Sequence, residues 1–296
     1  MNGYQNCKLC PRECGVNRVD TKGYCGMSDS LFLARAALHF WEEPCISGNN
    51  GSGTVFFSGC NMKCVYCQNH SIAIGETGKA VSFERLCEIY FELKEKGANN
   101  INLVTPSHYL PHVIKSIERA KLMGFDLPFV YNTSAYEKTE SIKALDGLID
   151  IYLPDYKYFL SKDSKKYSNA PDYPSVALKA IDEMHRQVSP NAFNDGIMQR
   201  GIIIRHLLLP GKVIESKLAL KCLYERYGDS VYLSIMNQYT PLSHVECLPE
   251  LNRRVSNREY NSLCDYAAGL GIKNAYIQNG ETAMESFIPS FDFEGI

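Results

Sequence analysis

The sequence predicts an α/β fold in which a mostly parallel sheet is covered by helices. Two observations lead to this prediction. Short apolar runs typical of buried strands alternate with longer segments whose apolar residues recur at helical spacing. Most of the connections between these segments are short. Near-continuous apolar strands that alternate with helices are typical of a parallel sheet with helices packed against it.

Six strand–helix units follow one another from residue 53 onward. The first strand, "GTVFFSG", is bounded by glycines, and the helix after it begins behind the N-cap residue Ser82 and stops at Gly97. The predicted strands span residues 53–59, 100–106, 127–134, 148–155, 201–211 and 231–239, with a short last strand at 274–279. The predicted helices span residues 82–98, 110–124, 136–147, 176–188, 213–228 and 256–271. Residues 156–175 are predicted as a loop over one face.

Two architectures fit these units. A closed eight-stranded barrel typically takes ~250 residues, whereas about 225 residues here contain only six clear units. A partial barrel and a doubly wound open sheet are therefore the two candidate architectures. In both, the active site lies at the carboxyl ends of the strands. We divide the chain into a cysteine-rich segment, 1–50, and a barrel domain with a C-terminal extension, 51–296.

The composition argues against several classes of protein. The 296 residues carry a net charge of −2 and are 45% hydrophobic, which is ordinary for a globular protein and provides no basic field for nucleic acid or anionic lipid. No apolar run approaches the ~20 residues of a membrane span. The first residues, "MNGYQNCKLC", lack the apolar core of a secretory signal. We therefore expect a cytoplasmic protein.

Cysteine is unusually frequent, with twelve copies. In a chain without secretory features, this number favours metal or redox chemistry over a disulfide framework. One group consists of Cys7, Cys10, Cys14 and Cys25, and a second consists of Cys60, Cys64 and Cys67. Isolated cysteines are usually small buried residues, and this interpretation applies to Cys87, Cys222, Cys247 and Cys264. The role of Cys45, which is close to both groups in sequence, stays open.

The second group lies in "GCNMKCVYCQNH", directly after the first predicted strand. Structural zinc prefers four protein ligands in two separated pairs, and catalytic zinc favours histidine with cysteine or carboxylate. In a four-iron cluster each iron takes one external ligand, so three cysteines leave one iron open. The alternatives are a zinc knuckle that borrows a distant fourth ligand and a chance set of three thiols.

The pattern Cys-x3-Cys-x-aromatic-Cys, with Tyr66 before the third cysteine, resembles the signature of the radical S-adenosylmethionine (SAM) superfamily. The wider stretch "HFWEEPCISGNNGSGTVFFSGCNMKCVYCQN" is similar to the pyruvate formate-lyase activating enzyme-like proteins, in particular to an iron–sulfur subgroup with an N-terminal four-cysteine motif. Six further segments are similar to sequences of the same group: "CKLCPRECGVNR", "NLVTPSHYLP", "YLPDYKY", "YSNAPDY", "MHRQV" and "IIIRHLLLPG". The resemblance covers almost the whole chain.

This resemblance implies a partial (β/α)6 barrel of the TIM type and a [4Fe–4S] cluster held by Cys60, Cys64 and Cys67. The open iron would take the amino and carboxylate groups of SAM. The reduced cluster would cleave SAM to methionine and a 5′-deoxyadenosyl radical that abstracts hydrogen from a substrate. Such cleavage needs the low end of the range of roughly −700 to +450 mV that iron–sulfur clusters span. An electron donor such as flavodoxin or ferredoxin is therefore expected.

Residues at the strand ends are the candidates for SAM binding. In the superfamily the second strand often ends in a Gly-Gly-Glu type turn, which is replaced here by Thr105, Pro106, Ser107 and His108. Their carbonyls and hydroxyls are able to accept hydrogen bonds from an ammonium group. Tyr66 is a candidate for the adenine. The other candidates from strand ends are Ser134, Asp155, Lys157 and Gln238.

Arg205 is the candidate for the SAM carboxylate, because a planar guanidinium fork matches carboxylate geometry. A structural ion pair is the alternative for Arg205, and a solvated loop position is the alternative for Lys157. His206 is expected on the opposite face of the strand from Arg205.

The N-terminal group has the spacing Cys-x2-Cys-x3-Cys-x10-Cys. Four thiolates among loop-forming glycines and a proline fit a closed metal site, either zinc or a second iron–sulfur cluster. Because the segment is short and polar, metal binding would account for its folding. Reduced cysteines packed against the barrel are the alternative. The segment is a candidate for docking a partner, relaying electrons or covering the cluster.

Three hypotheses describe the function. The first, which rests on the resemblance, is hydrogen abstraction from a glycine of a glycyl-radical enzyme. The second is a radical SAM enzyme that acts on a small molecule or another peptide, with RNA disfavoured by the absence of a basic stripe. The third is a non-catalytic iron–sulfur or zinc protein.

Overall fold

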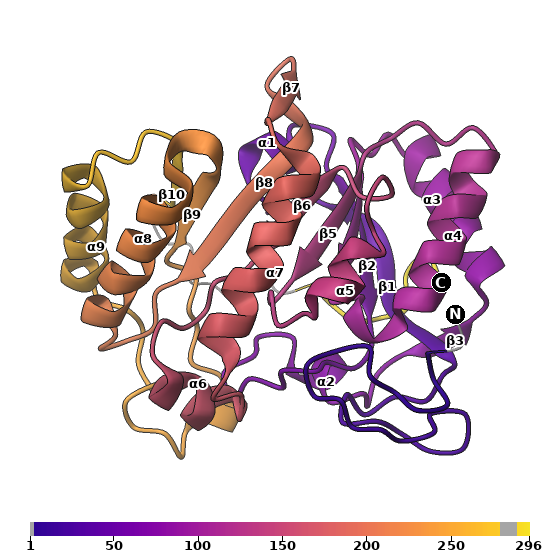
Figure 1. The fold of residues 1–296 in the computed structure, drawn as a ribbon, viewed down its shortest axis with the longest axis horizontal. Helices are drawn as coiled ribbons and strands as arrows, with labels where there is room; N and C mark the ends of the chain where they lie inside the picture. The colour runs from indigo at the N-terminus through magenta and orange to yellow at the C-terminus, as the bar shows by residue number, and fades with distance from the viewer. Residues whose placement is uncertain (1–2, 279–288) are drawn as a thin grey trace.

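The computed structural model describes residues 3–278 and 289–296, and its centre is a single twisted sheet (Figure 1). The strand order is β10-β9-β8-β6-β5-β4-β2-β1-β3, and β7 pairs with β8 outside this path. All neighbours from β2 to β10 run parallel, whereas β1 and β3 are antiparallel at one edge. The parallel strands are β2 (Ser52–Phe57), β4 (Ile101–Val104), β5 (Phe129–Thr133), β6 (Ile151–Pro154), β8 (Ile197–Leu207), β9 (Tyr232–Met236) and β10 (Ala275–Ile277). The antiparallel strands are β1 (Leu31–His39), β3 (Lys79–Val81) and β7 (Ala192–Asn194).

The helices cover the outer face of this sheet. The larger ones are α3 (Phe83–Glu95), α4 (Leu110–Leu122), α7 (Tyr173–Val188), α8 (Val213–Tyr227) and α9 (Asn257–Gly269). The short ones are α1 (Pro44–Ser47), α2 (His70–Ala73), α5 (Thr139–Lys143) and α6 (Ser161–Ser168). The predicted α/β class with an incomplete barrel is confirmed: parallel strands are joined by crossover helices, and the described strands do not close into a ring.

The inner face of the sheet is filled at its amino-terminal end by the connection between β1 and β2. Cys45 and Ile46, both in α1, pack against inward-facing side chains of β5, β6 and β8, namely Val130, Ile151, Leu153, Met198 and Ile203. The amide nitrogen Nδ2 of Asn100, just before β4, donates to the Ile46 carbonyl at 2.8 Å. Helix α1 therefore plugs the mouth of the barrel opposite the carboxyl ends of the strands.

Several elements differ from the prediction. Strand β1 pairs with β2 over six registered positions, although the sequence "LFLARAALH" has apolar residues on both faces and no clear alternation. Helix α6 lies within the predicted loop 156–175. Its buried side is made of Asp163, Ser164, Tyr167 and Ser168, so it has no apolar stripe to detect. The fifth long strand begins four residues earlier than predicted, at Ile197. The end of the predicted strand 274–279 lies outside the described residues.

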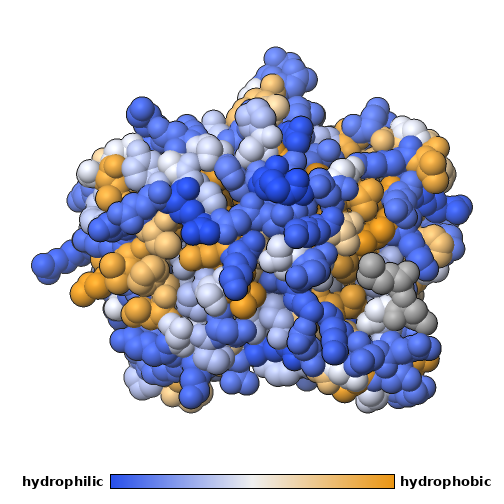
Figure 2. All heavy atoms as spheres, in the orientation of Figure 1, coloured by the Kyte–Doolittle hydropathy of each residue, from blue (hydrophilic) through white to orange (hydrophobic). Residues whose placement is uncertain are grey.

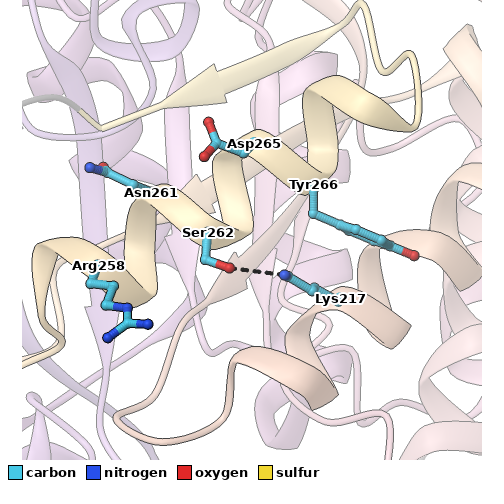
Figure 3. A pocket seen from close by; sticks show the side chains of 6 residues that line it. All are labelled: Lys217, Arg258, Asn261, Ser262, Asp265 and Tyr266. Atoms are coloured by element: carbon cyan, nitrogen blue, oxygen red, sulfur yellow. Dashed lines mark hydrogen bonds between the residues drawn. The ribbon is translucent and has the colours of Figure 1, made fainter.

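The outer surface is mainly polar. On the face shown in Figure 2, hydrophilic side chains predominate and hydrophobic ones form separate patches. A shallow groove between α8 and α9 is lined by polar groups, and there Lys217 donates to the Ser262 hydroxyl at 2.9 Å (Figure 3). No helix in residues 3–278 and 289–296 has the length and apolarity needed to span a membrane.

Truncation of the α1 plug tests its contribution to stability. Ile46 is fully buried, and Ile46→Ala should lower the free energy of unfolding by about 2–5 kcal/mol because it leaves a cavity. Leu122→Ala, at a position 90% exposed, is the control and should change it by no more than about 0.5 kcal/mol. Urea-induced unfolding followed by circular dichroism measures both. Equal, small effects would mean that α1 does not close the barrel.

Candidate metal and SAM site

A cavity of about 320 Å³ lies at the carboxyl ends of the parallel strands. All three cysteines of the loop after β2 line it, together with residues that follow β4, β5, β6 and β9 and residues in the last part of β8. Among the lining residues are Cys60, Cys64, Tyr66, Cys67, Thr105, Asn132, Ser134, Asp155, Lys157, Arg205 and Gln238. The fold thus brings together, in one cavity, most of the residues that the sequence suggested.

The loop that carries the cysteines leaves β2 through a crowded glycine. Gly59 has φ of +88°, and a Cβ atom there would lie 2.3 Å from Cγ of Met27, so a larger residue does not fit. Two of the sulfurs accept hydrogen bonds: Cys60 Sγ from the Met62 amide at 3.3 Å, and Cys64 Sγ from the Ser168 hydroxyl at 3.0 Å. Such bonds to sulfur tune the potential of a cluster.

Burial favours the neutral thiol form of the loop cysteines unless a cation lies beside them. Burial raises the pKa of the Cys67 thiol to about 12, and burial also raises that of Cys60. The thiolates therefore need cationic partners, which metal ions supply. The Lys157 ammonium is one nearby cation, and its charge acts against the increase in the pKa values of Cys60 and Cys67.

The donor set fits a [4Fe–4S] cluster. In the described residues, no three Cys, His, Asp or Glu side chains converge on the position of a single metal ion. A four-iron cluster uses a different iron for each thiolate, so its ligands surround a larger volume. Three cysteines that open onto a cavity with charged groups leave space for the SAM that the fourth iron would bind.

Arg205 is the centre of a buried ion-pair network beside the cysteines. Its guanidinium donates to Asp155 Oδ1 at 2.8 Å, to Glu42 Oε2 at 3.0 Å and to Asn132 Oδ1 at 2.5 Å. The second oxygen of Asp155 accepts from Lys157 Nζ at 2.6 Å. The structural ion pair considered for Arg205 is therefore present, and the same side chain also lines the cavity.

The charges in this network hold Asp155 ionised. Burial opposes its ionisation, but the positive charges of Arg205 and Lys157 outweigh burial and lower its pKa below the usual value. Glu42 behaves differently, because burial raises its pKa despite the attraction of Arg205. Asp155 is therefore the more readily ionised of the two carboxylates, and both of its oxygens accept hydrogen bonds from cations at the cavity.

The sequence reasoning missed Glu42, Asn102 and Asn132. Asn102 donates to Glu42 Oε1 at 3.0 Å, and Asn132 lines the cavity. A signal was present, because each asparagine is a polar residue within a largely apolar strand, "INLV" and "FVYNT". A buried amide needs a hydrogen-bond partner, and here the partners are the β1–α1 connection and Arg205.

Four of the predicted SAM contacts lie in the cavity wall, and one of them, Gln238, accepts a hydrogen bond from the Gln278 amide at 3.1 Å. Thr105 follows β4 with φ of +60°, a conformation that is strained for a β-branched residue and typical of functional sites. Ser134 and Gln238 line the cavity after β5 and β9. The Tyr66 ring is mostly surrounded by Tyr158, Tyr167 and Tyr239, with ring centroids 6.2–6.4 Å away.

Ser107 and the two histidines considered are placed differently. The Ser107 hydroxyl is buried and donates to Glu137, and Ser107 does not line the cavity. The buried ring of His108 bonds the Ser58 carbonyl at 2.7 Å, and burial lowers its pKa to about 3. His206 contacts the Tyr156 carbonyl through Nδ1 at 2.6 Å, on the side of β8 away from the cavity.

Glu137 gives the loops after β4 and β5 a pH dependence. Burial raises its pKa from about 4.5 to about 7, so between these values the folded chain retains a proton that the unfolded chain has lost. Stability should therefore fall as pH rises from about 4.5 to 7, by up to about 3 kcal/mol. Glu137→Gln keeps the acceptor of the Ser107 and Thr133 hydroxyls and should remove this dependence.

Thermal unfolding at pH 5.5 and pH 8 measures the effect. The stability of Glu137→Gln relative to the unmodified chain should rise between these two pH values. Glu140→Gln, at an exposed position of α5, is the matched control and should show no such change. Parallel pH dependence in all three proteins would contradict the assignment.

Comparisons with known proteins agree with this geometry. The uncharacterized protein MJ0674 of Methanocaldococcus jannaschii is 25% identical over 282 residues, which cover 93% of this chain and 78% of that protein. The structure of Streptococcus suis SuiB bound to S-adenosylmethionine is similar with a TM-score of 0.50 and 14% identity, over 75% of this chain and 49% of SuiB. A radical SAM methyltransferase from Sphaerobacter thermophilus is similar with a TM-score of 0.51 and 13% identity, over 77% of this chain and 66% of that one.

The two solved structures share the fold with this chain, which spans about half the length of SuiB. The family itself is indicated by sequence. The profile of the Radical SAM superfamily matches residues 54–212, more than half of the chain, from β2 through the cysteine loop to the residues that follow β8. Together with the three cysteines at the carboxyl end of β2, this match establishes that the chain belongs to the radical SAM superfamily.

Proposed function

We propose that this chain is a radical SAM enzyme of the pyruvate formate-lyase activating enzyme-like group. When bound, the [4Fe–4S] cluster and SAM supply reductive cleavage of the sulfonium to methionine and a 5′-deoxyadenosyl radical that takes hydrogen from a substrate. The observation that carries the proposal is that Cys60, Cys64 and Cys67, without a fourth cysteine, open onto the same cavity as the Arg205 network.

The residues of the chain have separate roles in this proposal. The three thiolates hold the cluster, and the hydrogen bond from Ser168 to Cys64 together with the Lys157 charge tunes its potential. Asp155 would accept hydrogen bonds from the ammonium group of SAM, and Lys157 or Arg205 would bind its carboxylate. Thr105, Ser134, Tyr66 and Gln238 complete the wall, and Ser107 positions the loop after β4 through Glu137.

The proposed substrate is a glycine Cα of a glycyl-radical enzyme, and the proposed reductant is a flavodoxin or ferredoxin. A small molecule or another peptide is the second candidate, because it would use the same cofactors and fold. We also propose that Cys7, Cys10, Cys14 and Cys25 bind zinc or a second iron–sulfur cluster. The expected cytoplasmic location stays a prediction.

Cleavage of SAM tests the proposal directly. Anaerobically reconstituted protein with dithionite and SAM should form 5′-deoxyadenosine, measured by chromatography, with a rate well above that of a sample without dithionite. A protein with an intact cluster that forms none would be a non-catalytic iron–sulfur or zinc protein, which is the third hypothesis.

The substrate is tested by mixing the reduced, SAM-loaded protein with candidate glycyl-radical enzymes from the same genome. A glycyl radical should appear in the electron paramagnetic resonance spectrum, and replacement of the target glycine by alanine in the partner should remove it. Formation of 5′-deoxyadenosine without any glycyl radical would favour a small molecule or another peptide.

Substitution of a single loop cysteine separates the two metal sites. Cys64→Ala should abolish cluster assembly in the barrel, because the loop then has two ligands, while metal at the N-terminal cysteines remains. Metal analysis and the electron paramagnetic resonance signal that responds to SAM measure this. Cys247→Ser, at an exposed cysteine, is the control and should behave as the unmodified chain. Loss of both metals in Cys64→Ala would contradict two separate sites.

A further inference from the structure

Arg18 is a buried cation for which the structure offers no carboxylate. Its side chain is fully buried, and its guanidinium donates to three carbonyls: those of Met27 at 3.1 Å, Ser28 at 2.5 Å and His108 at 2.6 Å. Among the described residues, no Asp or Glu oxygen lies within 4.0 Å of it. The rings of Tyr4 and Tyr109 lie 4.8 and 5.6 Å from the guanidinium and offset part of the cost of burying its charge. An anion beside it would offset more of this cost.

The groups beside Arg18 that are able to become anions are the N-terminal cysteines. Nη1 of Arg18 lies 3.9 Å from Cys7 Sγ. A Cβ atom on Gly23 would lie 3.3 Å from Arg18 Cδ and 3.5 Å from the sulfurs of both Cys14 and Cys25. Cys10 lies close enough to interact electrostatically with Cys7 and Cys25. The four thiols and the guanidinium therefore form one cluster.

The chemistry of this cluster changes on metal binding. As neutral thiols, the four cysteines leave Arg18 with carbonyl and aromatic partners but without an anionic one. Among the described residues these four sulfurs do not converge on the position of a single ion, so Zn²⁺ would require them to move closer together, whereas a [4Fe–4S] cluster uses a different iron for each thiolate. With either group the four thiolates give an overall charge of −2, which more than offsets the charge of the buried guanidinium. Outer partners of this kind orient metal ligands and support metal affinity.

The N-terminal segment is also joined directly to the loop of the barrel cluster. The Cys60 amide donates to the Cys25 carbonyl at 3.2 Å, and Arg12 Nε donates to the Asn61 carbonyl at 2.8 Å. Arg18 holds the His108 carbonyl, and the His108 ring holds the Ser58 carbonyl. In Figure 1 the indigo N-terminal segment lies next to α2, below the sheet.

We propose that Cys7, Cys10, Cys14 and Cys25 form an anionic metal–thiolate centre, that Arg18 is its counter-ion, and that this centre holds the loop of Cys60 in place for cluster assembly. This proposal rests on the metal assignment made under the proposed function. It adds that Arg18 is the charge partner of the metal centre and that the barrel cluster needs this centre. Arg18 is a positioning residue: it acts through the thiolates and through His108. Assembly of the barrel cluster depends on the N-terminal centre, whereas the N-terminal centre binds its metal without the barrel cluster.

Metal content identifies the centre. The full chain, purified anaerobically from cells supplied with iron and zinc, should contain about four iron atoms and one zinc, or about eight iron atoms, per chain. Either result supports a metal–thiolate centre and distinguishes its two forms. Four iron atoms with no second metal would overturn the proposal.

Substitution of Arg18 tests the counter-ion role. Arg18→Met should weaken retention of the N-terminal metal against a chelator by about 10- to 100-fold, and Arg18→Lys, which keeps the charge, should recover part of this loss. Arg258→Met, at an exposed arginine in the groove of Figure 3, is the control and should retain metal normally. Circular dichroism confirms that each variant is folded. Normal retention in folded Arg18→Met would overturn the role.

Substitution of Cys14 tests the coupling. Cys14→Ser should lose the N-terminal metal and should also reduce, several-fold, the fraction of barrel cluster whose electron paramagnetic resonance signal responds to SAM. A full SAM-dependent signal in Cys14→Ser without N-terminal metal would overturn the coupling. These measurements are independent of turnover: both metals present with no 5′-deoxyadenosine would contradict the proposed enzyme function and leave the metal centre intact.

Discussion

The buried guanidinium of Arg205 constrains the interior of the barrel. Because a charge removed from water needs close partners, its three contacts tie together parts of the chain that are far apart in sequence: Asp155 after β6, Asn132 in β5 and Glu42 before α1. The same contacts fix how far the plug of α1 enters the barrel and where the ends of β5, β6 and β8 lie. The walls of the cavity therefore depend on one network of charges.

The cavity and the N-terminal segment solve the problem of buried charge in different ways. In the cavity, two cations, Arg205 and Lys157, face Asp155 and Glu42, so the protein supplies both signs and a zwitterionic ligand enters with little change in net charge. Around Arg18, the described residues supply the cation alone. An organic zwitterion suits the first environment, and a metal with four thiolates suits the second.

The sequence predicted the six strand–helix units because a buried parallel sheet leaves a strong apolar pattern, and it predicted the site at the strand ends because Cys60, Cys64 and Cys67 are close together in the chain. It did not predict α6, whose buried side is polar, or β1, whose small apolar residues fit both faces. The contact between Glu42 and Arg205 joins residues 163 positions apart, and no local pattern identifies such a partner. Ser107 was placed in the right loop, but the carboxylate that captures its hydroxyl, Glu137, is 30 residues away.

The docking of Arg18 onto His108 has a consequence for the protein during its synthesis. These residues are 90 positions apart, and a ribosome that adds ~5–20 residues per second needs roughly 5 to 20 s to make the intervening chain. During this interval the four N-terminal thiols have emerged without the β4 segment that later covers their arginine. The nascent segment then exposes four cysteines to the thiols and metal ions of the cell. If these cysteines bind metal as proposed, the N-terminal centre is able to load before the loop of Cys60, Cys64 and Cys67 is in place.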